Sequence, residues 1–136
     1  MKKMTKAFSL LEMIFSIVVI SVIASIAIPK FMSTKDDAVV STLKQDISTV
    51  TTSVQSYYLV NGKIDKISDA VNLNSSVWDI SDSAIIYNDQ SNECVKVEIS
   101  SLDNDIQLIL TVNEDAGSIC EKLASSGMTS TIYKLR

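Results

Sequence analysis

One acidic residue, Glu12, interrupts an otherwise apolar N-terminal stretch of this 136-residue chain. Residues 13–29 carry no charged side chain, and the uncharged run extends back to residue 7 apart from Glu12. A carboxylate inside such a segment costs about 2.5–3.5 kcal/mol on membrane-insertion scales. We therefore expect Glu12 to have a cationic partner; the alternative is a carboxylate that reaches the lipid headgroups.

The partner of Glu12 has few possible sources. After Glu12 the next basic residue is Lys30, about 27 Å further along a helix. The cation must come from the lysines within residues 2–6 or from another chain. A cut before Phe8 would add a third possible source of the cation, the new α-amino group of Phe8. In its own helix this amine would lie one turn from Glu12, and in a filament it could meet Glu12 of a neighbouring subunit.

The remaining composition excludes several kinds of chemistry. The chain has no His, which removes the usual general base and the commonest metal ligand. Its three glycines are scattered and build no phosphate-binding loop, and its two cysteines are too few for a zinc site. We expect no catalytic residue, no metal-binding residue and no cofactor, and we expect that the protein is not an enzyme. Calcium at residues 103–105 and 114–115 remains an alternative without assigned ligands, because Asp and Asn are also ordinary turn residues.

Charge is distributed unevenly along the chain. The formal net charge is −4, while residues 1–6 contain three lysines and no acid. The remainder is acidic, so we expect no direct nucleic-acid binding. As a helix, residues 7–29 would extend about 34 Å, enough to cross the hydrocarbon core of a membrane. The lysine bias is slight and favours a cytoplasmic N-terminus.

Residues 6–12, Lys-Ala-Phe-Ser-Leu-Leu-Glu, resemble the processing motif of type IV pilins and pseudopilins. The basic leader, the small residue before the cut, Phe at the new N-terminus and Glu as fifth mature residue all match, and Pro29 is similar to a proline common in that family. The resemblance implies cleavage between Ala7 and Phe8 by a prepilin peptidase, N-methylation of Phe8, and filament assembly through Phe8 and Glu12.

The segments that follow are consistent with the α+β fold that this resemblance implies. We expect a leader at 1–7, a transmembrane or filament-core helix at 8–29 with a kink at Pro29, and an amphipathic helix at 30–61. A capping box at 34–37 predicts that the helix restarts or bends there. Apolar residues then recur at helical spacing, and Asn61-Gly62 ends the helix. These apolar positions are Val39, Val40, Leu43, Ile47, Val50, Val54, Tyr57 and Tyr58.

Residues 62–136 predict a small antiparallel β-sheet head packed on the amphipathic helix. Alternating patterns predict strands at 84–87, 93–100 and 106–112, a hairpin turn at 103–105 and a further strand within 129–135. A short helical pattern lies near 66–73. We expect the single tryptophan, Trp78, to be a packing residue beneath a loop.

Cys94 and Cys120 predict a disulfide that supplements the thin core of such a small head. The chain-entropy estimate for this cross-link is about 3.5 kcal/mol. A disulfide fits an oxidising compartment such as the periplasm. The alternative is two reduced, buried thiols.

The leading interpretation is a structural subunit of a periplasmic pseudopilus or type IV pilus-like filament, serving type II protein secretion or DNA uptake. Its expected partners are copies of itself, other pilin-like subunits, a prepilin peptidase, membrane lipid, and an inner-membrane assembly platform with a separate ATPase. It would span the inner membrane once, with the head in the periplasm, and enter a periplasmic or extracellular filament after assembly. The alternative is an envelope binding module or enzyme with a conventional signal sequence, cut before Ile28.

Overall fold

The computed structural model describes residues 8–102 and 105–135 and shows the expected α+β architecture: a long N-terminal helix, with an antiparallel sheet packed on it. The chain divides into two compact units, Met1–Lys35 and Asp36–Arg136. The helices are α1 (Leu10–Asn61), η1 (Ile67–Asp69), η2 (Glu114–Ala116) and α2 (Ser118–Ser125). The strands are β1 (Asp79–Ile80), β2 (Ala84–Asp89), β3 (Asn92–Leu102), β4 (Asp105–Val112) and β5 (Thr131–Lys134).

Helix α1 continues without interruption through Pro29 and through the predicted capping box. The predicted restart is therefore wrong, and the alternative of a bend at 34–37 stays a prediction. Thr34 does not cap a new helix, because its hydroxyl donates a hydrogen bond to the Lys30 carbonyl one turn earlier, at 3.0 Å. The kink expected at Pro29 stays a prediction.

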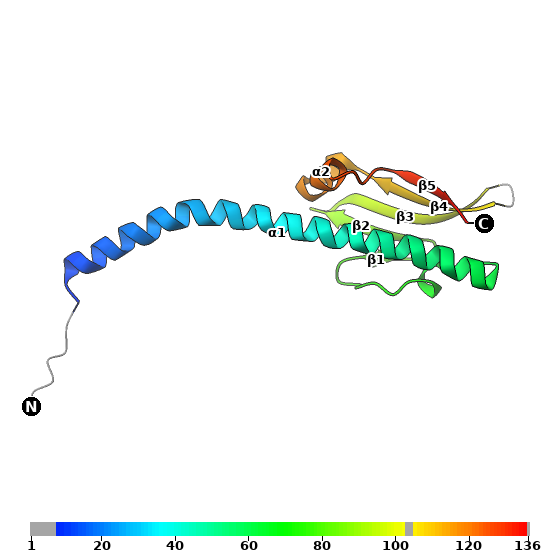
Figure 1. Ribbon diagram of the computed structural model, residues 1–136, viewed down its shortest axis with the longest axis horizontal. Coiled ribbons are helices and arrows are strands. Elements are labelled where there is room, and N and C mark those ends of the chain that lie inside the picture. Colours follow the sequence, from blue (N-terminus) through cyan, green and yellow to red (C-terminus); the bar gives the residue numbers. More distant parts are fainter. Residues whose placement is uncertain (1–7, 103–104, 136) are drawn as a thin grey trace, which may run out of the picture. The chain divides into compact units, whose positions relative to one another are not determined.

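The predicted apolar face of the amphipathic segment is confirmed. Figure 1 shows this half of α1 alongside the sheet. Its buried residues recur at steps of three and four, and they share one core with the buried residues of the sheet. These residues are Val40, Leu43, Ile47, Val50 and Val54. Beyond them α1 ends at Asn61, and Gly62 follows at φ +72°, the left-handed conformation that favours glycine at a helix end.

The sheet is a simple meander in the order β1-β2-β3-β4-β5, with every neighbouring pair antiparallel. The expected alternation in β3 and β4 is confirmed: Val95, Val97, Leu108 and Leu110 are all buried. The predicted hairpin turn between these two strands lies partly outside the described residues.

The strands are longer or shorter than the sequence patterns suggested. Strands β2 and β3 extend further because they are joined by a tight turn in which Gln90 and Ser91 have positive φ angles of 50° and 74°. Such a turn usually carries Gly or Asn, so its residues gave no clear signal. The C-terminal strand is confined to β5, and the two-residue β1 was not predicted.

One helical prediction differs from the structure, and one helix was not predicted. The pattern near 66–73 forms only η1. Helix α2 has only eight residues, of which Cys120 and Leu123 are buried. Two buried positions are too few to show a helical repeat of apolar residues in the sequence.

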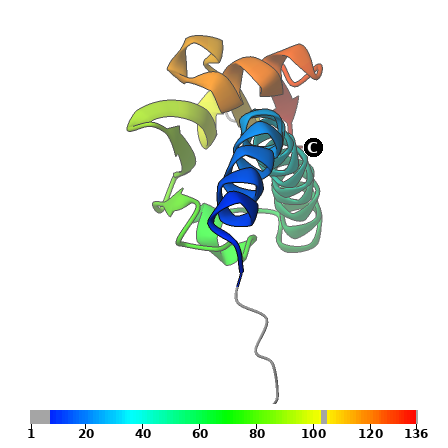
Figure 2. The same cartoon turned by 90° about the vertical axis from the view of Figure 1, so that its left-hand side faces the viewer.

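Charged and polar contacts join α2 to α1 within the second unit. Lys122 forms ion pairs with Asp36 at 3.9 Å and Asp37 at 2.9 Å, and the Lys44 ammonium donates to the Ser126 carbonyl at 3.2 Å. Figures 1 and 2 both place α2 on one side of this part of α1 and the segment 63–78 on the other.

The segment 63–78 is fixed to α1 by the tryptophan. Trp78 is 1% exposed, and its indole N–H donates to the Asp46 carboxylate at 2.8 Å. Its ring also contacts Tyr87 of β2, with 5.8 Å between ring centroids. The predicted packing role of Trp78 is confirmed.

Candidate functional site

The first turn of α1 is built around Ser9 and Glu12. The helix begins at Leu10, and the Ser9 hydroxyl accepts a hydrogen bond from the Glu12 backbone amide at 3.4 Å. Ser9 is therefore the N-cap residue and Glu12 the third residue of the helix. The serine-x-x-glutamate spacing is the sequence signal of a capping box, and Ser9 was not among the predicted site residues.

Glu12 presents its carboxylate on an exposed apolar surface. A shallow groove beside it is lined by Ser9, Leu11, Ile14, Phe15 and Val18. Among the described residues, no ion pair includes Glu12. The carboxylate thus lies in surroundings that contain helix N–H groups and apolar side chains but no cation from the described part of its own chain.

The segment around Glu12 has a surface suited to lipid or to other helices. Every residue from 8 to 35 is exposed except Ala24, which is half-buried. By length and composition α1 is apolar enough to cross a membrane, with a mean hydropathy of 2.5 over its best window, a test that signal sequences also pass. Such a surface is stable only when lipid or a neighbouring protein covers it.

The serines of this segment are compatible with an apolar environment. The hydroxyls of Ser16, Ser21 and Ser25 donate to the carbonyls of Glu12, Ile17 and Val22 at 2.7–2.8 Å. Each of these three hydroxyls donates to a carbonyl of its own helix, so their burial in lipid or between helices leaves no serine hydroxyl without an acceptor. These small side chains also permit close helix approach.

The predicted cleavage site is only half described. Ala7 lies outside the described residues. Phe8, the expected mature N-terminus, precedes the helix and is 75% exposed. The structure thus brings Phe8, Ser9 and Glu12 together at one end of α1, while Pro29 lies within the same helix some turns away.

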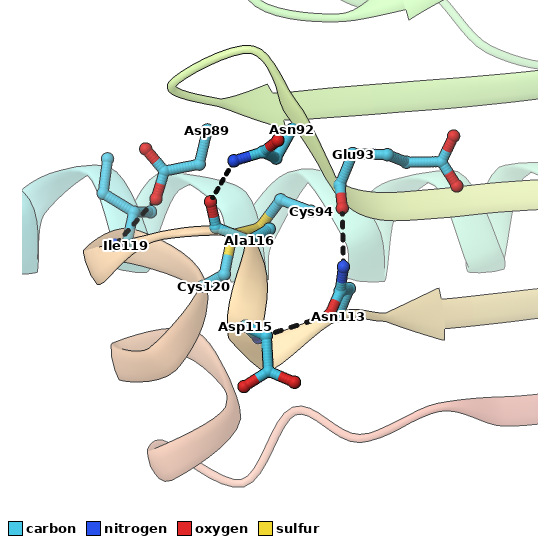
Figure 3. Close-up of a disulfide and its surroundings, with 9 residues drawn as sticks. All are labelled: Asp89, Asn92, Glu93, Cys94, Asn113, Asp115, Ala116, Ile119 and Cys120. Carbon is cyan, nitrogen blue, oxygen red and sulfur yellow. Dashed lines mark hydrogen bonds between the residues drawn. A yellow bond between two sulfur atoms is a disulfide. The ribbon is translucent and has the colours of Figure 1, made fainter.

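The second set of predicted site residues, the cysteines, forms the disulfide between β3 and α2 (Figure 3). Their Cα atoms are 5.8 Å apart, and both side chains are at most 1% exposed. The β2–β3 register skips Cys94, because Tyr87 pairs with Val95 and Asn88 pairs with Glu93. This bulge lets Cys94 and Val95 both face the interior, which strict alternation would not allow.

A buried carboxylate holds the start of α2 beside this disulfide. Asp89 is 5% exposed and accepts a hydrogen bond from the Ile119 backbone amide at 2.9 Å. Asn92 donates to the Ala116 carbonyl at 3.1 Å (Figure 3). A Cβ at Gly117 would collide with the Asp89 carboxylate, so a larger residue there would have to displace this side chain. Sequence patterns did not reveal this arrangement, because its residues come from separate segments.

Burial and nearby acidic side chains raise the pKa of one tyrosine of the head. The pKa of Tyr87 is raised above its usual value, first by desolvation and then by the negative charges of Asp89 and Asp36. Neutral Tyr87 is therefore the form that the core favours. This residue has no role in the candidate site at the start of α1.

The acidic residues considered for calcium lie partly within the described segments, at Asp105, Glu114 and Asp115. In the described segments, no group of three His, Cys, Asp or Glu side chains is arranged to hold a metal ion. Glu114, Asp115 and Glu121 line a shallow polar depression at the start of α2. Asp103 and Asn104 lie outside the described residues.

The N-terminal segment matches a known sequence motif. Residues 2–28 match the family model described as the prokaryotic N-terminal methylation motif. No curated protein and no solved structure matched the chain. The matched residues include Phe8, Ser9 and Glu12, the same residues that the structure brings together. The chain therefore carries a type IV pilin-like prepilin motif at its N-terminus, joined to a head with a pilin-like α+β layout.

Proposed function

We propose that the protein is a structural subunit of a pseudopilus or type IV pilus-like filament of the cell envelope. The observation that carries the proposal is the methylation motif at residues 2–28, which indicates a pilin-type precursor. Within it, Glu12 is a charged residue on an apolar helix surface. The motif also implies a prepilin peptidase and other pilin subunits as partners.

In the proposed pathway the chain is stored in the inner membrane with its N-terminus in the cytoplasm and its head in the periplasm. The peptidase cuts between Ala7 and Phe8, and the Phe8 amine is methylated. An assembly platform with a separate ATPase then moves the subunit into the filament, where it serves protein secretion or DNA uptake.

Electrostatics explains why cleavage and assembly would be coupled. Removal of residues 1–7 turns Phe8 into a cation at the end of an apolar helix. In a filament, the amine of one subunit would meet Glu12 of its neighbour, and each charge would then be neutralised in surroundings that exclude water. The pair would also fix the axial offset between adjacent subunits.

The test is the intact mass of the protein isolated from the envelope, with a peptidase-deficient strain as control. We expect a chain that begins at N-methylated Phe8 in the parent strain and at Met1 in the control. A mature chain that begins at Ile28 would instead indicate a conventional signal sequence and a released binding module or enzyme. A chain that keeps Met1 in the assembled filament would also overturn the proposal.

A further inference from the structure

Two lysines follow the apolar part of α1, and their ammonium groups have no partner among the described residues. Lys30 comes directly after Pro29, and Lys35 is the last residue of the first unit. Both are exposed, and among the described residues no ion pair or side-chain hydrogen bond is formed by either ammonium group. Between them, Phe31 and Met32 are 72% and 63% exposed.

The acids that follow these lysines in the sequence neutralise them only in part. Asp36 and Asp37 both form ion pairs with Lys122 of α2, within the second unit. Lys122 offsets one of these two negative charges, so the three lysines and the two aspartates together carry a net charge of +1. A small excess of positive charge therefore remains where the apolar segment ends.

We propose that Lys30 and Lys35 bind the phosphate groups of anionic phospholipids in the leaflet next to the head. Lysines near the end of a membrane helix extend their ammonium groups to the headgroup region while their methylene chains stay in apolar surroundings. The two lysines are about 7.5 Å apart along the helix axis. That distance is close to the thickness of one headgroup layer, about 5–7 Å. The exposed side chains of Phe31 and Met32 would enter the same boundary.

This inference rests on the membrane-stored form of the proposed function, and it adds a partner of defined chemistry. Anionic lipid would hold the stored subunit at a fixed depth until assembly withdraws the helix. The helix surface that carries the lysines is separate from the Phe8 and Glu12 end, so the two interactions can be tested independently.

The test is a lipid titration of the full-length chain by native mass spectrometry, with phosphatidylglycerol compared against phosphatidylcholine. All versions carry Gln at the leader lysines within residues 2–6, which would otherwise bind anionic lipid themselves. Because each lysine near a membrane surface contributes about fivefold in affinity, we expect Lys30→Gln/Lys35→Gln to bind phosphatidylglycerol about 25-fold more weakly.

The matched control is Lys63→Gln/Lys66→Gln, which removes the same charge from two exposed head lysines that are paired with Asp65 and Asp82. This control should bind phosphatidylglycerol as the parent does. Equal affinity of the parent for the two lipids, or an unchanged affinity in the Lys30→Gln/Lys35→Gln variant, would overturn the inference while leaving the filament proposal intact. A mature protein that begins at Ile28 would overturn both, since no membrane-stored form would exist.

Discussion

Glu12 is the residue on which the proposed assembly depends. It occupies the third position of α1, where unpaired backbone N–H groups give the helix end a partial positive charge. The Ser9 hydroxyl already satisfies the Glu12 amide, so the side-chain carboxylate remains available for another donor. The partial positive charge of the helix end therefore stabilises the Glu12 carboxylate in a single subunit. Complete neutralisation of this carboxylate requires a cationic group.

Replacing Glu12 with Gln keeps the shape of the side chain and removes its charge. We expect Glu12→Gln to be inserted and cut normally, yet to give at least tenfold fewer filaments, because the neighbour's Phe8 amine would lose its counter-ion. Quantifying subunits in sheared filament fractions measures this effect. Ser16→Ala on the same exposed helix is the control, and normal filament yield from Glu12→Gln would contradict the pairing role.

Tyr87 gives a pH-dependent prediction in the head. Because its pKa is raised in the folded state, its contribution to stability is fully present below pH 10, the usual tyrosine pKa, and is lost as the pH rises through the folded-state value. Above about pH 10 the free energy of unfolding should therefore decline with pH, and less steeply in Tyr87→Phe. Denaturant titrations between pH 8 and about pH 11 measure these slopes.

General alkaline destabilisation is measured in the parent protein, against which the slope of Tyr87→Phe is compared. Lys96 adds to the decline in both proteins, since its pKa is also raised, mainly by its hydrogen bond with Glu98. Parallel slopes for the parent and Tyr87→Phe would refute the assignment to Tyr87.

At the scale of elements, the second half of α1 is the central support of the head. Its buried residues contact the sheet, Asp46 holds Trp78, and Asp36, Asp37 and Lys44 contact α2. Each of these contacts lies on residues 36–54, so the same stretch of about five turns fixes the sheet, the preceding loop and the C-terminal helix.

The contact between Asp46 and Trp78 can be tested by truncation. Asp46→Ala leaves a buried indole N–H without an acceptor, and we expect a loss of about 1–3 kcal/mol in the free energy of unfolding. Asp46→Asn keeps an acceptor oxygen and should cost less. Fluorescence of the single tryptophan reports the unfolding directly. Equal stability of the parent and Asp46→Ala would show that the hydrogen bond contributes nothing.

The sequence predicted those elements whose periodicity extends over several residues on one surface. The apolar face from Val40 to Val54 and the alternation in β3 and β4 follow directly from burial on one side. Helix α2 and β1 were not predicted, because they are short and are stabilised by distant residues such as Asp89. The N-terminal motif was predictable from spacing alone, whereas the pairing of Lys122 with Asp36 and Asp37 needed the fold.

At the scale of the whole molecule, the two compact units differ in what stabilises them. The second unit has its own core and a disulfide, and ion pairs and hydrogen bonds hold α2 in place. The described part of the first unit, residues 8–35, is almost entirely helical, and its residues are exposed almost throughout. Stability of the folded head and assembly of the filament should therefore respond to different substitutions.

Removal of the disulfide tests this separation. Cys94→Ala/Cys120→Ala should lower the free energy of unfolding of the head by about 2–5 kcal/mol, because the unfolded chain regains the freedom that the cross-link removes. Denaturation of the full-length protein in detergent measures the change, with Ser125→Ala on the exposed side of α2 as control. A double variant as stable as the parent would contradict the role of the disulfide.

The boundary at Asp36 has a practical consequence for the study of this protein. Every buried residue of α1 lies at or beyond Val40, and the two aspartates that bind Lys122 begin at residue 36. A truncated chain that begins just before Asp36 would lack the exposed apolar segment of α1 and would keep the core and the ion pairs that stabilise the head. Such a fragment should be obtainable in water without detergent, which would make the head accessible to crystallisation and to solution spectroscopy.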